Sequence, residues 1–186
     1  SGAIAYVFRG REVDAASFYN LLTSNGYTVT LVPLSDILTT DFSQFDLILI
    51  ADDSGSLNEW GSAGLTASQV DQIQKANQPI IGIGEGGYAY FGQVPRFLGW
   101  PNGWHGPDAD LAKAATAPPA YFNGVPGDPV TLYAQPVNAV AIYLGIPVPA
   151  DAFAIGLETP DTNHANLIQQ GCDLLWGFSG NPLGMT

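Results

Sequence analysis

The sequence predicts an α/β fold of three layers, in which a mostly parallel sheet carries helices on both faces. The runs 46–51 and 80–83 are almost continuously apolar and of strand length, which is typical of parallel strands covered on both sides. Strand-like and helix-like patterns also alternate three times in the first half of the chain. Such alternation implies right-handed crossovers and a doubly wound sheet.

The first half of the chain divides into elements with clear boundaries. Residues 4–8 are rich in strand formers, and residues 14–24 have apolar side chains at helical spacing. Asn25 and Gly26 then form a helix-ending pair, and a second strand is expected at 27–33. A short helix or irregular crossover should connect it to the next apolar strand.

The elements that follow are predicted from capping and turn signals. Residues 57–64 are rich in Gly and Ser and are expected to form a loop. Thr66 and Gln69 have the spacing of a capping box, which predicts a helix continuing to about Asn77. After the next strand, a further helix is expected to begin near Tyr88.

The second half of the chain differs from the first in composition. From Val94 onward the sequence is rich in loop formers, which predicts a loop-rich insertion. Short strands are expected within 131–134, 152–157 and 173–178, some of them antiparallel additions at one sheet edge. Because no internal repeat and no second hydrophobic core is evident, residues 1–186 are expected to form one domain.

Composition limits the classes of partner and the location. The chain has 17 acidic and 5 basic residues, a formal net charge of −12, so no nucleic-acid partner is expected. No apolar run approaches the roughly 20 residues of a membrane helix, so no membrane insertion is expected. Low lysine content with mostly uncharged polar residues is typical of secreted or surface-exposed bacterial proteins. We therefore expect an extracellular or cell-surface location, with other domains of a longer chain as potential partners.

A glycine-rich turn follows the buried strand at 80–83. Its sequence Gly84-Glu85-Gly86-Gly87 has the form of a nucleophile elbow, in which a strained turn holds one residue above the carboxyl end of a strand. Glycines flank that residue because the neighbouring backbones approach too closely for a Cβ atom. The pattern assigns the elbow position to Glu85 and makes the three glycines candidate binding residues.

With this turn and the order of elements over residues 4–91, the chain resembles the class I glutamine amidotransferase-like superfamily, which has a flavodoxin-like fold. In that family the elbow reads Gly-X-Cys-X-Gly, and the cysteine is the nucleophile of a Cys-His-Glu triad. Residues 82–87 align with this motif and place Glu85 at or beside the cysteine's position. Because a carboxylate attacking an amide would give a reactive anhydride, the resemblance implies that amide transfer is lost.

The histidine and glutamate of the family's triad cannot be identified in this sequence. Neither histidine lies in the family's His-Pro-Glu sequence, since His164 follows Asn163 and His105 follows Trp104. Cys172, the single cysteine, precedes an apolar run that has the pattern of a strand. It is expected to be an ordinary buried or half-buried thiol.

Three interpretations of Glu85 remain open. Its carboxylate could accept hydrogen bonds from the N-terminus of the following helix and stabilise the turn. It could act as a general acid, base or nucleophile of altered chemistry with His164 or His105. It could also bind a metal ion with Asp52 or Asp53, although no metal is assigned.

Two further groups of residues are candidates for binding. Asp52 and Asp53 follow an apolar strand on the rim where open α/β sheets bind ligands, and Arg9 follows the first strand on the same rim. The alternative is an Asx turn whose charges Arg9 and Arg11 neutralise. Trp104 and its neighbour His105 lie in an aromatic loop suited to stacking on sugar rings, although packing of that loop on the sheet would also explain it.

The sequence as a whole favours a catalytically degenerate amidotransferase-like domain, a pseudoenzyme with a binding or structural role in a secreted or surface protein. One alternative is a hydrolase that uses Glu85 with a histidine or with a carboxylate-bound metal. A second is a carbohydrate-binding module. The expected ligand is a small molecule or a carbohydrate, and no cofactor is assigned.

Overall fold

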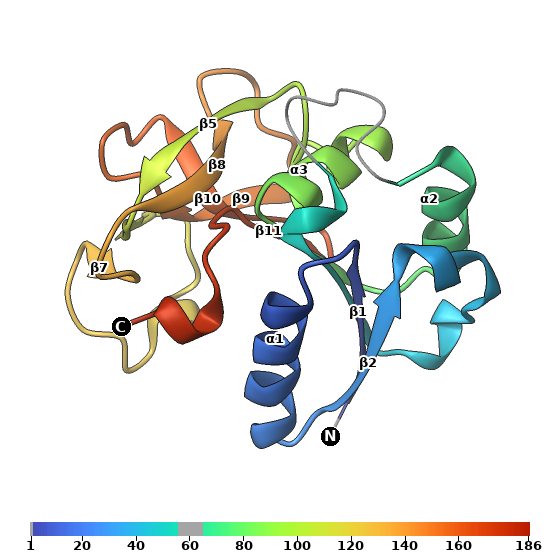
Figure 1. The fold of residues 1–186 in the computed structure, drawn as a ribbon. Helices are drawn as coiled ribbons and strands as arrows, with labels where there is room; N and C mark the ends of the chain where they lie inside the picture. The colour runs from blue at the N-terminus through green and yellow to red at the C-terminus, as the bar shows by residue number, and fades with distance from the viewer. Residues whose placement is uncertain (1, 56–64) are drawn as a thin grey trace.

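The computed structural model describes residues 2–55 and 65–186, and the loop predicted at 57–64 lies outside the described residues. One extended sheet runs through the described part of the chain and has two halves of different character. Parallel strands form the half that carries the helices, and antiparallel strands form the other half (Figure 1).

The parallel half has the strand order β2-β1-β3-β4-β11, and each of these strands is parallel to its neighbours. The strands are β1 (Ala3–Phe8), β2 (Thr28–Pro33), β3 (Leu47–Ile50), β4 (Ile80–Ile83) and β11 (Asp173–Trp176). Their side chains are mostly buried on both faces in the central strands β1, β3 and β4. This arrangement confirms the parallel sheet predicted from the continuous apolar runs.

Helices cover both faces of the parallel half. Helix α1 (Glu12–Ser24) packs on one face, where Ala15 joins a core with alternate residues of β1, β3 and β4. Helices α2 (Ala67–Gln74) and α3 (Gly84–Gln93) contribute to the core of the opposite face. The capping box predicted at the start of α2 is present. The three-layer α/β fold class is therefore confirmed.

Short 3₁₀ helices occupy several of the connections. They are η1 (Leu34–Thr39), η2 (Phe42–Gln44), η3 (Asp52–Ser54), η4 (Pro119–Phe122) and η5 (Pro182–Gly184). The helix η5 near the C-terminus lies beside α1 (Figure 1), where Asn181 Nδ2 donates a 2.6 Å hydrogen bond to Asp14 Oδ1. The last residues of the chain are thus bound to its first helix.

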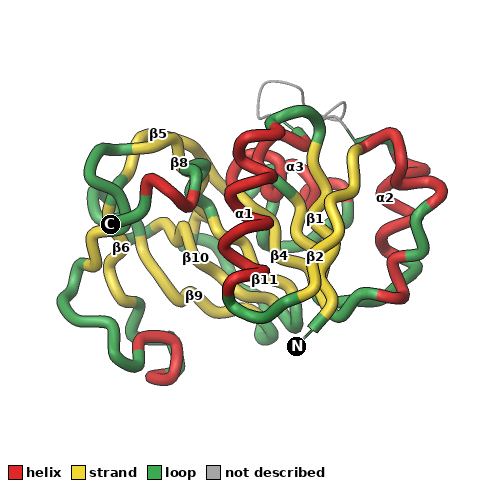
Figure 2. Tube along the Cα trace, turned by 60° about the horizontal axis from the view of Figure 1, so that its bottom comes forward, coloured by secondary structure: helices red, strands yellow, loops and turns green. Residues whose placement is uncertain are grey.

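The antiparallel half extends the sheet beyond β11 (Figure 2). Its strands are β5 (Gly103–Asp108), β6 (Asp110–Lys113), β7 (Val130–Thr131), β8 (Val137–Tyr143), β9 (Ala152–Leu157) and β10 (His164–Gln170). The order continues from β11 through β10, β9, β6 and β7, while β8 pairs with both β10 and β5. Strands β5 and β8 therefore form a two-stranded ribbon joined to the sheet through β10.

The second half of the chain contains more strands than its sequence predicts. No strand was expected at β5, β8 or β10, and His164 is the first residue of β10 rather than part of a polar loop. Strand β5 has the sequence GWHGPD, whose glycines and proline disfavour strands, so pairing with β8 decides its conformation. Tertiary contacts overrode the local preference here.

Two smaller expectations are also corrected by the structure. The helix expected to begin near Tyr88 begins at Gly84, so it includes the elbow and follows β4 directly. Cys172 is exposed, because it lies in the turn between β10 and β11 where Gly171 has a φ of 58°. Among the described residues, no helix is long and apolar enough to cross a membrane.

Candidate functional site

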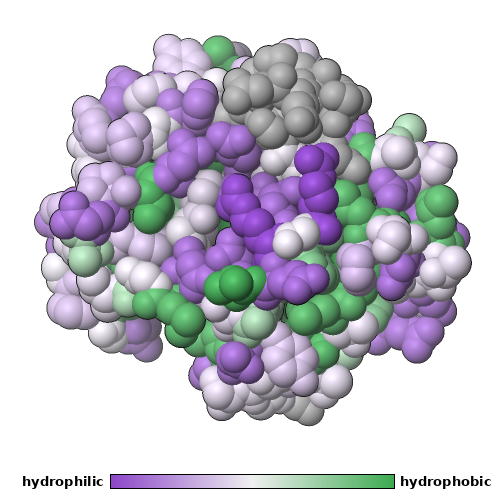
Figure 3. Space-filling model, in the orientation of Figure 1, coloured by the Kyte–Doolittle hydropathy of each residue, from purple (hydrophilic) through white to green (hydrophobic). Residues whose placement is uncertain are grey.

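A polar cavity of about 620 Å³ lies at the carboxyl ends of the parallel strands. Hydrophilic side chains gather at the centre of the face seen in Figure 3, in the region of this edge. The cavity is lined by Arg9, Gly10, Arg11, Asp52, Asp53, Gly55, Glu85, Val137, Asn138, Ser179 and Gly180. Four of the predicted site residues, Arg9, Asp52, Asp53 and Glu85, are therefore brought together in one place.

Close backbone packing explains the glycines of the elbow. A Cβ atom on Gly87 would overlap the backbone of Gly82, and one on Gly86 would lie 2.7 Å from the carbonyl oxygen of Asp52. At both positions main-chain atoms lie too close for a Cβ atom, and main chain cannot move aside cheaply. Gly86 and Gly87 consequently hold α3 against β4 and do not offer a binding surface.

The strained position of the elbow is Gly84, one residue earlier than the sequence pattern predicted. Gly84 has a φ of 54°, whereas Glu85 is not among the residues with positive φ. A Cβ atom on Gly84 would overlap the carboxylate of Asp52 and lie 2.6 Å from Ser179 Oγ. The residue at the apex of the turn therefore has no side chain, and the space in front of it is filled.

The Asp52 carboxylate fills that space and accepts three hydrogen bonds. The backbone N–H of Glu85 donates to Asp52 Oδ1 over 2.8 Å, and the Ser179 hydroxyl donates to the same oxygen over 2.6 Å. Arg11 Nη1 lies 2.6 Å from Asp52 Oδ2, which confirms the expected neutralisation by this arginine. Burial raises the pKa of Asp52, and these three donors partly offset that effect.

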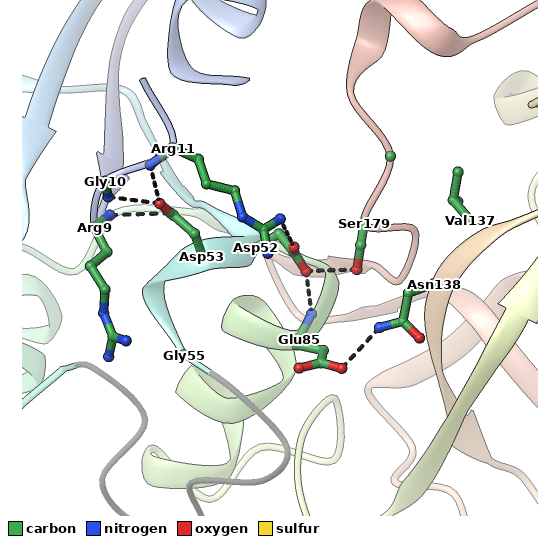
Figure 4. A pocket seen from close by; sticks show the side chains of 11 residues that line it. Arg9, Gly10, Arg11, Asp52, Asp53, Gly55, Glu85, Val137, Asn138 and Ser179 are labelled. Carbon is green, nitrogen blue, oxygen red and sulfur yellow. Dashed lines mark hydrogen bonds and ion pairs between the residues drawn. The ribbon is translucent and has the colours of Figure 1, made fainter. Parts of the chain in front are cut away.

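The Asp53 carboxylate closes the turn between β1 and α1. It accepts three consecutive backbone N–H groups, from Arg9 at 3.1 Å, Gly10 at 2.8 Å and Arg11 at 2.6 Å. These donors are more than 40 positions away in the sequence, so the arrangement is not the local Asx turn considered above. Asp53 thus ties the η3 segment to the start of α1 (Figure 4).

Glu85 and Asn138 face each other across the pocket (Figure 4). The Asn138 side-chain amide donates to Glu85 Oε1 over 2.8 Å, which joins α3 to β8. His105 Nδ1 lies 3.7 Å from the same oxygen, just beyond hydrogen-bond distance. The pocket therefore has one wall from the parallel half and one from the β5–β8 ribbon.

The other predicted residues lie elsewhere. Trp104 neighbours His105 on β5, but side chains alternate along a strand, and the Trp104 indole Nε1 donates to Glu158 instead, over 3.2 Å. His164 is beside Glu158 and not beside Glu85. Cys172 precedes β11, which is parallel to β4, so it lies at the opposite edge of the sheet from the elbow.

Trp104 and His164 belong to a second polar cluster around Glu158, which the sequence analysis missed. Glu158 and Asp108 are both buried, and burial, with the nearby Asp108 carboxylate second, raises the pKa of Glu158 to about 7. His164 Nδ1 lies 3.1 Å from Asp161 Oδ2 and 3.9 Å from Glu158 Oε2. No group of three His, Cys, Asp or Glu side chains in residues 2–55 and 65–186 is arranged to hold a metal ion.

Asn138 and Ser179 are pocket residues that the sequence analysis also missed. Ser179 follows the apolar run 173–178, so the rule that pointed to Asp52, a polar residue after a parallel strand, could have found it. Asn138 had no such signal. Its place depends on the pairing of β8 with β5 and β10, which the sequence does not specify.

Comparisons with known proteins place this geometry in a structural context. No protein-family model and no curated protein matches the chain. Among solved structures, a glutamine amidotransferase from Thermotoga maritima matches with a TM-score of 0.61 at 10% identity, covering 95% of this chain and 74% of that one. The chain has a glutamine amidotransferase-like fold.

Two other solved structures support the same conclusion about the fold. The PurLQS structure from Thermotoga maritima matches with a TM-score of 0.58 at 16% identity, covering 95% of this chain and 85% of that one. A β-galactosidase from a psychrophilic Marinomonas matches with a TM-score of 0.55 at 9% identity, over 100% of this chain but 27% of that one. The same fold is thus found within a much larger chain.

Proposed function

We propose that this chain is an amidotransferase-like domain without amide-transfer chemistry, which binds a small polar ligand in the pocket beside the elbow. The geometry of Gly84 carries the proposal. The apex of the turn, where a nucleophile would be exposed, has no side chain, and the Asp52 carboxylate occupies the adjoining space. Cys172 lies at the opposite edge of the sheet and offers no substitute.

The pocket itself supports a binding role. Its polar groups come from both halves of the sheet, and Asn138 and Glu85 meet across it through a 2.8 Å hydrogen bond. Asp52 and Asp53 each accept three hydrogen bonds from protein groups, so the frame of the pocket is preorganised without a ligand. An uncharged or weakly cationic polar molecule is the class that this acidic, hydrogen-bonding lining favours.

Binding and activity are tested together with three forms of the protein. Wild type, Glu85→Gln and Asn138→Ala are screened by thermal shift against small polar molecules, including sugars, and are assayed for ammonia release from glutamine. We expect no ammonia release, and a ligand-induced rise in melting temperature that both substitutions reduce. Asn123→Ala is the matched control, because Asn123 is exposed and does not line the pocket. Ammonia release by wild type would contradict the proposal.

A second candidate function is hydrolysis by Glu85 with His105. The observation that favours it is the 3.7 Å separation of His105 Nδ1 from Glu85 Oε1, since Glu85 lines the pocket. Turnover of a substrate found in the screen would support this function if Glu85→Gln and His105→Gln each abolished the turnover and left the melting temperature unchanged. Binding without turnover supports the binding role.

We also propose that the domain is part of a secreted or surface protein of bacterial origin. The strongly acidic, lysine-poor composition supports an extracellular location. The match to a 27% portion of a β-galactosidase shows that a fold of this kind exists within a larger enzyme, which supports a modular role. Fractionation of source cells with an antibody against the domain would test the location, and recovery in the cytosol would contradict it.

A further inference from the structure

The strongest remaining feature is the polar cluster around Glu158 on the antiparallel half. It lies against the β5–β8 ribbon, which also forms one wall of the pocket. The cluster contains Trp104 from β5, Tyr143 from β8, His164 from β10, and the carboxylates of Glu158 and Asp161 from the connection between β9 and β10. None of these five residues lines the pocket.

Strand register places the aromatic members of the cluster on one face. Trp104 pairs with Ala141, and Tyr143, two residues along the same strand as Ala141, pairs with His164. Paired and alternate residues share a face of a sheet, so Trp104, Tyr143 and His164 meet there. The ring centroid of His164 is 5.4 Å from Trp104 and 5.2 Å from Tyr143.

Residues of β5 and β8 that alternate with these lie on the opposite face of the ribbon, toward the pocket. His105 pairs with Val140 and lies 3.7 Å from the Glu85 carboxylate. On β8, Asn138 donates its hydrogen bond to Glu85. The ribbon therefore presents the polar cluster on one face and the pocket wall on the other. A movement of the ribbon at the polar cluster would therefore also move the side chains of the pocket wall.

We propose that the cluster is a proton-sensitive clasp that holds the β5–β8 ribbon against β10 and so regulates the geometry of the pocket. This inference rests on the proposed function for its output, because the pocket is what the clasp would regulate. The proton that the clasp gains and loses is that of the buried Glu158 carboxyl.

Electrostatics gives the direction of the effect. When Glu158 is ionised, its negative charge is repelled by the Asp108 and Asp161 carboxylates, which both raise its pKa. Uptake of one proton by Glu158 removes this repulsion. Lower pH therefore tightens the clasp, and higher pH loosens it through repulsion between buried carboxylates.

The groups that face Glu158 support a midpoint near neutrality. Glu158 is 3% exposed, its Oε2 accepts one hydrogen bond from Trp104, and Asp108 and Asp161 both raise its pKa, which is about 7. Asp108 is 4% exposed and stays hydrogen-bonded to the backbone N–H groups of Ala109 and Asp110.

The clasp is tested by NMR titration of the protein without any ligand, from pH 5.5 to 8.5. The probes are the Trp104 indole N–H for the cluster and the Asn138 side-chain amide for the pocket. In wild type we expect both probes to shift with a common midpoint near pH 7. In Glu158→Gln both probes should lose that transition.

The outcomes separate the clasp from the proposed function. A wild-type Trp104 probe that is flat across this range overturns the clasp. A Trp104 transition that the Asn138 probe does not share, or an Asn138 response unchanged in Glu158→Gln, overturns the coupling to the pocket. Asp161→Asn removes a charge that raises the pKa of Glu158 and should lower the cluster midpoint, which provides a second test if Glu158→Gln is poorly folded. Since no ligand is used, failure to find a ligand leaves this experiment interpretable.

Discussion

The polar clusters on the two faces of the β5–β8 ribbon both contain carboxylates, but the hydrogen-bond donors around these carboxylates differ. At the elbow, the carboxylates of Asp52 and Asp53 accept six hydrogen bonds between them, four from backbone N–H groups. In the second cluster, Glu158 is more deeply buried, accepts a hydrogen bond from Trp104 and lies near a second carboxylate, Asp108. Burial raises the pKa of both Asp52 and Glu158, but three donors partly offset it at Asp52, whereas Glu158 has the Trp104 donor and nearby carboxylates that raise its pKa further.

The largest expected effect comes from filling the close contact that positions the elbow. Gly86→Ala would put a Cβ atom 2.6 Å from Ser54 Oγ and against the main chain of residues 51–52, none of which can move away cheaply. We expect a loss of about 3 kcal/mol in the free energy of unfolding, measured by denaturant titration. Gly10→Ala, where a Cβ atom meets nothing within 4 Å, is the control and should change stability by less than about 0.5 kcal/mol.

The second prediction concerns the buried Glu158. Its pKa rises from 4.5 in the unfolded chain to about 7 in the fold, so its contribution to stability is fully present below pH 4.5 and is lost as pH rises toward 7. Glu158→Gln removes this dependence. The stability of the variant relative to wild type should therefore increase between pH 5 and 8, by roughly 2 kcal/mol.

Thermal melts at several pH values check this prediction. Glu12→Gln is the control, because Glu12 is exposed in the first turn of α1 and should show no comparable trend. If the difference between Glu158→Gln and wild type is the same at pH 5 and pH 8, the contrast drawn between the two clusters is wrong.

The third prediction tests the elbow cluster through Asp53. Asp53→Ala removes the acceptor of three backbone N–H groups at the start of α1. Because water can replace it at this exposed turn, the expected loss is about 1–2 kcal/mol in the free energy of unfolding. Asp71→Ala, on the exposed surface of α2, is the control. Equal effects of the two substitutions would show that Asp53 has no structural role.

The smallest effect is expected at Cys172. Cys172→Ser should change stability by less than about 0.5 kcal/mol and leave ligand binding intact, because the thiol is exposed at the edge of the sheet opposite the pocket. The wild-type thiol should also react with a maleimide in the native protein. Slow labelling that requires denaturant would instead favour the buried thiol that the sequence analysis expected.

Local signals in the sequence are enough to predict the parallel half of the molecule. Continuous apolar strands, a capping box and a helix-ending Asn-Gly pair are local signals, and each is set by the residues that carry it. The glycines of the elbow could be predicted for the same reason, since the close approach of neighbouring backbones that they permit is part of the motif. Even the position of Asp52 and Asp53 followed from the rule that parallel strands end at one edge.

The antiparallel half and the details of the site depend on contacts between segments that are far apart in the chain. Strand β5 is held by pairing and not by propensity, so neither the meeting of Asn138 with Glu85 nor the cluster at Glu158 had a local signal. The strained residue proved to be Gly84, because Asp52, 32 positions earlier, fills the space before it. Contacts between distant segments depend on register and burial, and these are properties of the whole fold.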